Sequence, residues 1–170
     1  MGNISVAPRS RKELELIANR FRKLCNCTQL YFPIVELIEI LGEPDSYGRV
    51  IVNNEIVADH EMPQEYAEYA PLINTIRIRE SVYLGAHRGN GRDRFTLAHE
   101  LGHAILLGGA DCKYSRSQGI IPAYRDPEWQ ANTLASYLLM PRQLISGMDA
   151  STVALKCGTS LQAAQIALKK

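Results

Sequence analysis

The sequence predicts an α+β fold. Helical patterns come first along the chain, short strand patterns follow, and helical patterns then return. The composition agrees, because 46% of the 170 residues are hydrophobic and 22% are charged, as in an ordinary globular protein. This length suits one compact domain with a small appendage. We expect a main domain at 1–148 and a helix-turn-helix-like segment at 149–170 that packs on it.

Two helices are expected in the N-terminal part of the chain. Ser10 and Glu13 form a capping-box pattern, after which apolar residues recur at helical spacing. Pro33 suits the first position of a short apolar helix at 34–41, and Gly42 closes it. The turn-rich residues that follow lead into the strand region.

The predicted strands lie in the middle of the chain. We expect a strand at 50–57, or a hairpin that turns at Asn53 and Asn54. Residues 59–71 have no clear period, which predicts an exposed loop with at most a helical turn. Polar and apolar residues alternate at 75–79, which indicates a half-buried strand, and a short helix should follow at 80–86.

Helical patterns return in the C-terminal half. One helix is expected at 94–107 and a second at 128–140, where Pro141 ends it. The stretch at 108–127 between them is irregular and has no strong period. From about residue 150, the tail divides into two short helical segments around 157–160.

The most informative residues form an H-E-x-x-H pattern at 99–103. A separation of four residues turns a helix by roughly 400°, so His99 and His103 project from one face and can offer two nitrogens to one Zn²⁺. Glu100 can reach a water at such a metal without being a ligand. The alternative is a buried helix whose histidines are satisfied by hydrogen bonds. Two histidines at this spacing, with Glu100 between them and apolar flanks, favour zinc.

A catalytic zinc site needs a third protein ligand and an open position. Glu128 is the best candidate, because it shares a helical stripe with Ala131, Ala135 and Leu138 and should start from the buried face. The alternative is an exposed first-turn residue that stabilises the start of its helix. Three rival ligands lie in predicted loops: Asp126, Asp111 and His60.

Three further residues in the irregular stretch are candidates for roles at the site. Tyr114 and Tyr124 could donate a hydrogen bond to the oxyanion of a tetrahedral intermediate, although ordinary loop tyrosines explain them equally well. Cys112 follows His103 by nine residues, so its thiolate could occupy the open zinc position and hold the site latent. The alternative for Cys112 is a free loop thiol.

Charge and hydropathy exclude other classes of protein. The net charge is +1, and no basic side chain lies between Ser160 and Leu168, so we do not expect direct nucleic-acid binding. There is no export signal and no apolar run approaching the roughly 18 residues of a membrane span. The four cysteines are scattered and should be reduced thiols. These features predict a cytoplasmic protein.

Two motifs, in order, carry a resemblance to a known family. The stretches NGRDRFTLAHELGH at 90–103 and EWQANTLASYLLMP at 128–141 resemble the ImmA/IrrE family of zinc metallopeptidases. The strand and turn at 76–83 and the helical tail are also similar to that family, so the resemblance runs from about Arg9 to the end. One departure is Leu134, where the family usually has Phe, which changes the core and not the chemistry.

The resemblance implies a zincin-like fold, in which a small antiparallel or mixed sheet packs on the helix of the H-E-x-x-H motif. It implies that His99, His103 and Glu128 bind Zn²⁺ and that Glu100 is the catalytic acid/base in peptide-bond hydrolysis. Its implied substrate is a helix-turn-helix repressor encoded nearby in a mobile-element, stress or defence locus, whose cleavage relieves repression.

Two other functions remain open at this point. The first is a non-proteolytic zinc-containing module that sequesters a regulator or acts in a toxin–antitoxin pair. A pure binder has no need of Glu100, so the intact motif favours the enzyme. The second is a structural zinc domain, which the lack of a fourth protein ligand disfavours.

Overall fold

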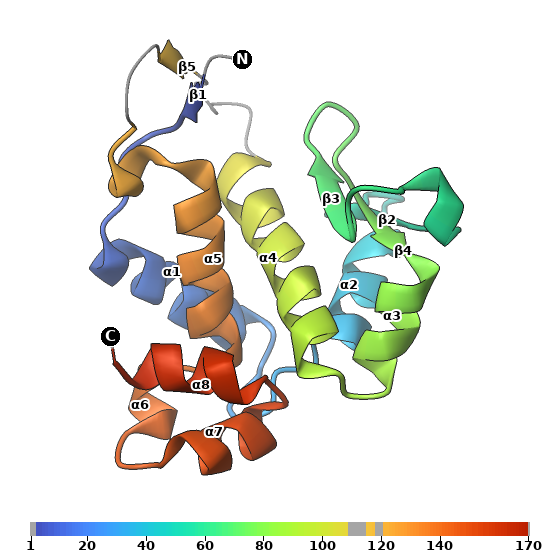
Figure 1. The fold of residues 1–170 in the computed structure, drawn as a ribbon. Helices are drawn as coiled ribbons and strands as arrows, with labels where there is room; N and C mark the ends of the chain where they lie inside the picture. The colour runs from blue at the N-terminus through green and yellow to red at the C-terminus, as the bar shows by residue number, and fades with distance from the viewer. Residues whose placement is uncertain (1–2, 109–114, 118–120, 170) are drawn as a thin grey trace.

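The computed structural model describes residues 3–108, 115–117 and 121–169. Helix α4 (Gly91–Leu107) runs through the middle of the molecule (Figure 1). Helices α5 (Pro127–Leu139) and α1 (Arg11–Leu24) lie on one side of it. The sheet lies on the other side, together with α2 (Ile34–Gly42) and α3 (Glu80–His87). This mixed α+β architecture confirms the predicted fold class and is consistent with a minimal zincin-like fold.

The sheet on α4 is small and mixed. Strand β4 (Thr75–Arg79) is central and pairs in parallel with β2 (Asn53–Val57) and antiparallel with β3 (Ala67–Ala70). Strands β3 and β4 both contact α4. The expectation of a loop throughout 59–71 was wrong, because it missed β3. This strand is only four residues long, which is the lower limit at which alternation can indicate a strand.

The expected hairpin turn at Asn53 and Asn54 was also wrong. Both residues belong to β2, which begins at Asn53 and not at residue 50. The Asn54 side chain donates a hydrogen bond to the Ile38 carbonyl oxygen at 3.0 Å, which ties the strand to α2. A residue typical of turns is therefore tolerated in the strand because its amide has a backbone partner in the next element.

The predicted helix starts are largely confirmed. The Ser10 backbone N–H donates to Glu13 Oε2 at 2.7 Å and the Ser10 hydroxyl accepts from the Glu13 N–H, which completes the capping box of α1. Pro33 differs slightly from expectation, because it is the N-cap of α2 and not its first helical residue. Helix α4 begins three residues earlier than expected, since the Asn90 side chain caps it.

Several short elements complete the chain. Strand β1 (Asn3–Ser5) pairs antiparallel with β5 (Ser115–Ser117), a ribbon that the sequence did not predict. The chain also has two 3₁₀ turns, η1 (Asp59–Glu61) and η2 (Ala123–Arg125), and η2 contacts α5. The tail forms α6 (Arg142–Ile145), α7 (Ala150–Cys157) and α8 (Leu161–Leu168), so the two expected tail helices are confirmed.

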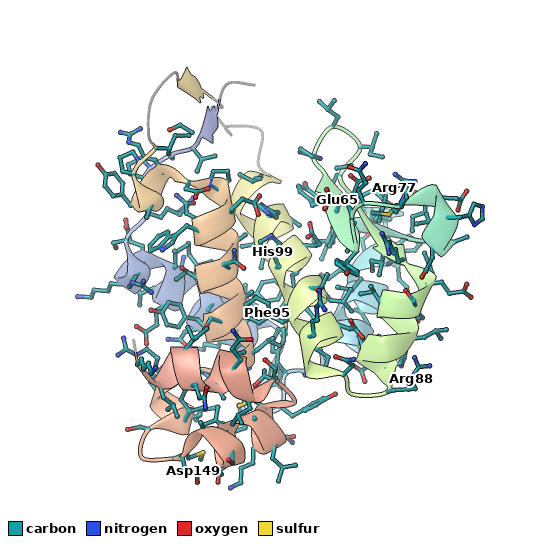
Figure 2. All side chains as sticks on the ribbon, in the orientation of Figure 1. Glu65, Arg77, Arg88, Phe95, His99 and Asp149 are labelled. Carbon is teal, nitrogen blue, oxygen red and sulfur yellow. The ribbon has the colours of Figure 1, made fainter. Side chains whose placement is uncertain are left out.

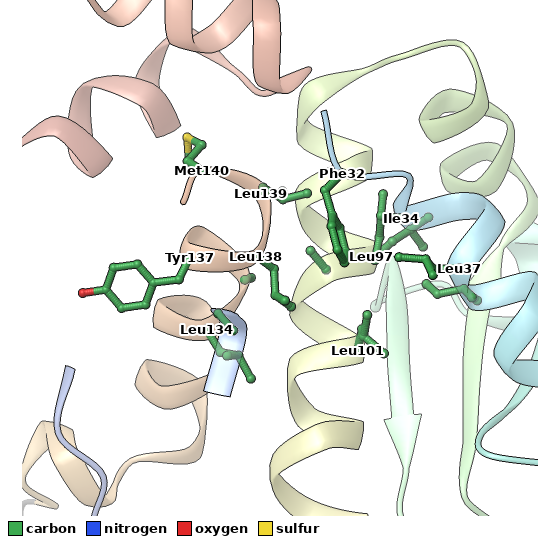
Figure 3. Close-up of a cluster of buried hydrophobic side chains, with 14 of the residues drawn as sticks. Phe32, Ile34, Leu37, Leu97, Leu101, Leu134, Tyr137, Leu138, Leu139 and Met140 are labelled. Carbon is green, nitrogen blue, oxygen red and sulfur yellow. The ribbon is translucent and has the colours of Figure 1, made fainter. Parts of the chain in front are cut away.

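Helix α4 is buried on two opposite sides. Figure 3 shows Leu97 and Leu101 of α4 between Leu134 and Leu138 of α5 and the side chains that precede and begin α2. Each of these four leucines is at most 1% exposed. Gly102 permits the close approach of α5, because a Cβ there would lie 3.2 Å from the Ala131 carbonyl oxygen. The core therefore fixes α4 against both of its neighbours.

The C-terminal helices share this core. Four buried residues of α7 and α8 belong to the same hydrophobic cluster as α4 and α5: Val153, Cys157, Ala164 and Ala167. The boundary between 148 and 149 stays a prediction. Within the described residues, no helix is both long and apolar enough to cross a membrane.

Candidate metal centre

His99 and His103 meet on one face of α4, as their spacing predicts. Their Nε2 atoms lie 3.0 Å apart, and the two rings are nearly perpendicular, with an interplanar angle of 83°. Both side chains are largely covered, with 16% of His99 and 11% of His103 exposed. Figure 2 shows His99 on α4 in the space between α4 and α5. Two imidazole nitrogens therefore point to a common place beside α5.

Glu128 reaches that place from the first turn of α5. Its Oε2 lies 3.2 Å from His99 Nε2, and its Oε1 lies 3.2 Å from His103 Nε2. Candidate ligand atoms from these three residues lie within 4.8 Å of one another. The expectation that Glu128 starts from the buried face was wrong, because 65% of its side chain is exposed. It stands at the end of the buried stripe, where α5 begins, and its carboxylate turns toward α4.

Asn132 orients the first histidine. Its Oδ1 lies 3.2 Å from His99 Nδ1, and because an amide oxygen can only accept, Nδ1 carries the proton. With Nδ1 engaged in this way, the ring turns Nε2 toward Glu128 and His103. Asn132 was not among the site residues predicted from the sequence. The signal was available, since Asn132 follows Glu128 by four residues and so lies on the same face of α5.

Glu100 is held by the sheet and by its own helix. Only 7% of the residue is exposed, and its Oε2 accepts a hydrogen bond from the Tyr69 backbone N–H at 2.8 Å. Tyr69 belongs to β3, a strand that was not predicted from the sequence. A backbone donor leaves no signature in the sequence, so nothing in the sequence could have identified this contact.

The surroundings of the site shift the pKa values of Glu100, Glu128 and His99. Burial raises the pKa of Glu100, and the nearby His99 and His103 partly offset that rise. Hydrogen bonds from His103 and His99 hold the pKa of Glu128 far below its usual range. Burial lowers the pKa of His99, but the hydrogen bond with Glu128 and nearby carboxylate charges outweigh it, so the pKa is raised overall. Glu128 therefore stays ionised, and its negative charge faces His99 and His103.

A cavity of about 560 Å³ gives access to these residues. His99, Glu100, His103 and Glu128 all line it. Strand β3 forms the opposite wall through Ala67, Glu68 and Tyr69. A chain segment that enters the cavity would therefore lie between the edge of the sheet and the start of α5.

The donor set fits a zinc ion. Zn²⁺ is bound by imidazole nitrogen and carboxylate oxygen, and its catalytic sites have three protein ligands and leave one position open. His99, His103 and Glu128 supply those three donors within the described residues. Asn132 provides the outer hydrogen bond that commonly fixes a zinc-bound imidazole. Glu100 lies beside the donors without being one of them.

The other predicted residues occupy different places. Tyr124 lies in η2 with 49% of its surface exposed, and it is not among the described residues that line the site cavity. Asp126 caps α5 by accepting from the Glu128 N–H at 2.9 Å, so the rival carboxylate has a structural partner. His60 is exposed in η1 and is not part of the metal group. Three remaining candidates lie outside the described residues: Asp111, Cys112 and Tyr114.

Comparisons with known proteins agree with the motifs. The family model of the IrrE N-terminal-like domain, Peptidase_M78, matches residues 54–167. A solved structure described as a Mycobacterium tuberculosis transcriptional regulator has a similar fold, with a TM-score of 0.60 and 14% sequence identity. That similarity covers 92% of this chain and 55% of the regulator's chain, so it concerns the fold alone. No curated protein matches the sequence.

The family match spans most of the site and its supporting elements. It begins in β2, includes α4 and α5 with all three candidate metal donors, and ends in α8. Both motifs that resemble ImmA/IrrE peptidases lie inside it. The chain therefore belongs to the IrrE N-terminal-like family of metallopeptidases, Peptidase_M78.

Proposed function

We propose that this protein is a zinc-dependent endopeptidase that cleaves a helix-turn-helix transcriptional repressor encoded nearby and so relieves repression. The observation that carries the proposal is the meeting of two histidines and one carboxylate beside the buried Glu100. A structural zinc site would have a fourth protein ligand. It would also have no use for a carboxylate such as Glu100, which is not a proposed ligand. The arrangement instead suits hydrolysis at an open metal position.

In this proposal His99, His103 and Glu128 hold Zn²⁺. When bound, zinc supplies Lewis acidity toward the scissile carbonyl and lowers the pKa of a water molecule. The protein's part is to keep the donors in place. Asn132 holds the His99 ring through Nδ1. Helix α5 carries both Asn132 and Glu128, so it positions the ligand Glu128 and also the residue that orients the ligand His99.

Glu100 is the proposed proton carrier. Its Oε2 is engaged by the Tyr69 N–H, which leaves Oε1 to take a proton from the attacking water and pass it to the leaving amine. Because the carboxylate is fixed from the sheet and from α4, it needs no reorganisation during that transfer. Positioned acid–base groups of this kind contribute roughly 10²- to 10⁴-fold in rate.

Two roles in the segment after α4 remain proposals. Tyr114 is kept as a candidate oxyanion donor, whereas the exposed position of Tyr124 in η2 gives that residue no direct support. Cys112 is kept as a candidate latch thiolate. A Cys112→Ser variant should show raised basal activity, and unchanged activity in reducing and oxidising buffers alike would exclude the latch.

The proposed substrate class rests on the family and on charge. The chain has a net charge of +1, and α8 carries no basic residue, so action on a DNA-binding partner is favoured over DNA binding by the protein itself. The structural neighbour described as a transcriptional regulator is compatible with a regulatory role. A cytoplasmic location fits a repressor substrate and is proposed with it.

The test is incubation with the repressor encoded beside the gene. Cleavage should require Zn²⁺, stop with a chelator and disappear in Glu100→Gln. Cleavage that persists in Glu100→Gln would contradict the mechanism. Zinc-dependent binding of the repressor without any cleavage would instead support the non-proteolytic binding module.

A further inference from the structure

A second cavity, of about 660 Å³, lies between α4, α5 and α8. Its apolar lining comes from Phe95 of α4, from the C-cap residue of α5, Met140, and from Ala163 and Ile166 of α8. The uncharged polar residues of the lining are Thr96, Asn132, Ser136, Ser160 and Gln162. Among the described residues that line it, Arg92 alone is charged, and its guanidinium stacks 5.0 Å from the centre of the Tyr66 ring. An uncharged, largely apolar occupant is therefore the one that this cavity would accept.

This cavity adjoins the metal centre. Asn132 lines it and also contacts His99 Nδ1 at 3.2 Å. Thr96, another lining residue, precedes His99 by three positions on α4, a distance of about one helical turn. Figure 2 shows Phe95 and His99 along the same helix, with α8 beyond Phe95. A peptide bound over His99 that runs along α4 toward Phe95 would advance by roughly 3.3 Å per residue when extended, which would bring a side chain near the scissile bond to the cavity.

The wall that α8 contributes is firmly attached. Arg94, which is fully buried, donates from Nε to the Gly158 carbonyl oxygen at 2.9 Å, at the end of α7. Gly91 packs directly on the backbone of Thr159 and Ser160, where a Cβ would collide with both residues. The Thr159 hydroxyl also lies 3.5 Å from Met140 Sδ. The start of α8 is thus held against α4 and α5, so the cavity is formed before any ligand arrives.

We propose that this cavity receives an apolar side chain of the protein substrate next to the cleaved bond, and that α8 thereby helps to set sequence preference. The inference rests on the proposed function, since it places a peptide over His99. Three observations support it: continuity through Asn132, apolar side chains from α4, α8 and the C-cap of α5 with Arg92 as the one charged residue among the described lining residues, and a size within the range of ligand pockets. The C-terminal segment then has a role in substrate selection.

The test measures binding, so it does not depend on cleavage. Two zinc-directed hydroxamates that differ only in carrying a leucyl or a seryl side chain are titrated calorimetrically into the zinc-loaded protein. We expect the leucyl probe to bind at least about tenfold more tightly, because its side chain leaves water for an apolar wall. Equal affinities would overturn the inference, as would a failure of both probes to bind.

Variants of α8 then locate the selectivity. Ala163→Trp fills the cavity and should abolish the leucyl preference, whereas Gln165→Trp, on an exposed part of α8 outside the lining, should keep it. Ile166→Glu is a second variant at a position that is 46% exposed, which should preserve the fold and weaken only the leucyl probe. Retained preference in both cavity variants would overturn the role of α8.

The outcomes separate this inference from the proposed function. Selective leucyl binding without cleavage of any neighbouring repressor would support the cavity assignment and contradict the peptidase. Repressor cleavage with no preference between the two probes would support the peptidase and contradict the cavity assignment. Zinc content and thermal melting are measured on every variant, so a change in affinity is not confused with loss of metal or of structure.

Discussion

The Tyr69 backbone N–H donates a 2.8 Å hydrogen bond to Glu100 Oε2. This contact joins the edge strand β3 to the helix that carries both histidines. The candidate site is consequently assembled from three elements, because α4 supplies the histidines and Glu100, α5 supplies Glu128, and β3 holds Glu100, which is not among the candidate ligands. The sheet therefore takes part in the proposed chemistry through its backbone.

Glu100→Gln should separate chemistry from binding. The Gln amide oxygen can accept the same hydrogen bond from Tyr69, so we expect an unchanged fold and zinc content. The amide cannot accept and return a proton, so repressor cleavage should fall by about 10²- to 10⁴-fold. The measurements are the cleavage rate, the zinc stoichiometry and the melting temperature. Loss of zinc in this variant would show that Glu100 has a different role.

Glu128→Ala should remove metal binding with little effect on the fold. The side chain is 65% exposed, so its loss leaves no buried cavity. Removal of one of three donors should weaken zinc binding by more than the roughly 10- to 100-fold typical of an outer-shell change. Glu65→Gln, another exposed residue that lines the site cavity, is the matched control and should bind zinc normally. Competition with a chromogenic chelator measures both affinities.

Asn132→Ala tests the outer hydrogen bond. Without the acceptor at His99 Nδ1, the ring loses its fixed tautomer, and zinc affinity should fall by about 10- to 100-fold. Asn132→Asp keeps an acceptor oxygen at the same position and should restore much of the affinity. Equal affinities of the alanine variant and the unmodified protein would show that the His99 ring is positioned without this contact.

The parts of this site that could be predicted are those formed by side chains, because residue type and spacing are visible in the sequence. The spacing of His99 and His103 specifies a helix face, and the structure has both on one face of α4. Glu128 was predicted to be a ligand because it was expected on the buried face of its helix, but its side chain is exposed. Its place at the start of α5 nevertheless brings the carboxylate to the histidines. The helical stripe predicted the correct side of α5 and the wrong exposure.

Two other features, the contact from β3 and the cavity beside α8, leave no local pattern in the sequence. Strand β3 contributes a backbone N–H, and a backbone donor is the same for every residue except proline. The cavity beside α8 depends on Gly91 packing against Ser160, residues far apart in sequence. Tertiary contacts of this kind follow from the whole packing arrangement, so periodicity within one segment cannot reveal them.

Arg94→Leu should destabilise the protein strongly. Arg94 is fully buried and donates to the carbonyl oxygens of Phe32 and Gly158 at 2.7 and 2.9 Å. Leucine would leave both acceptors buried without partners, at a cost of about 1–3 kcal/mol for each. Urea denaturation should therefore show a loss of about 3 kcal/mol or more. Arg20→Leu, on the exposed surface of α1, should change stability by no more than about 0.5 kcal/mol.

Tyr83 and Glu39 should make stability fall in alkali. A hydrogen bond from the phenol to the Glu39 carboxylate, followed by burial and the carboxylate charge, raises the pKa of Tyr83 from 10.0 to about 12. Because the pKa is higher in the folded protein, the stabilisation is complete below pH 10.0 and is lost as the pH rises toward about 12. Between those values, the free energy of unfolding should decline less steeply for Tyr83→Phe than for the unmodified protein. Absorbance titration provides the direct check, since the late-ionising phenol of Tyr83 should be missing from the variant, and identical titration curves would contradict the Glu39 contact.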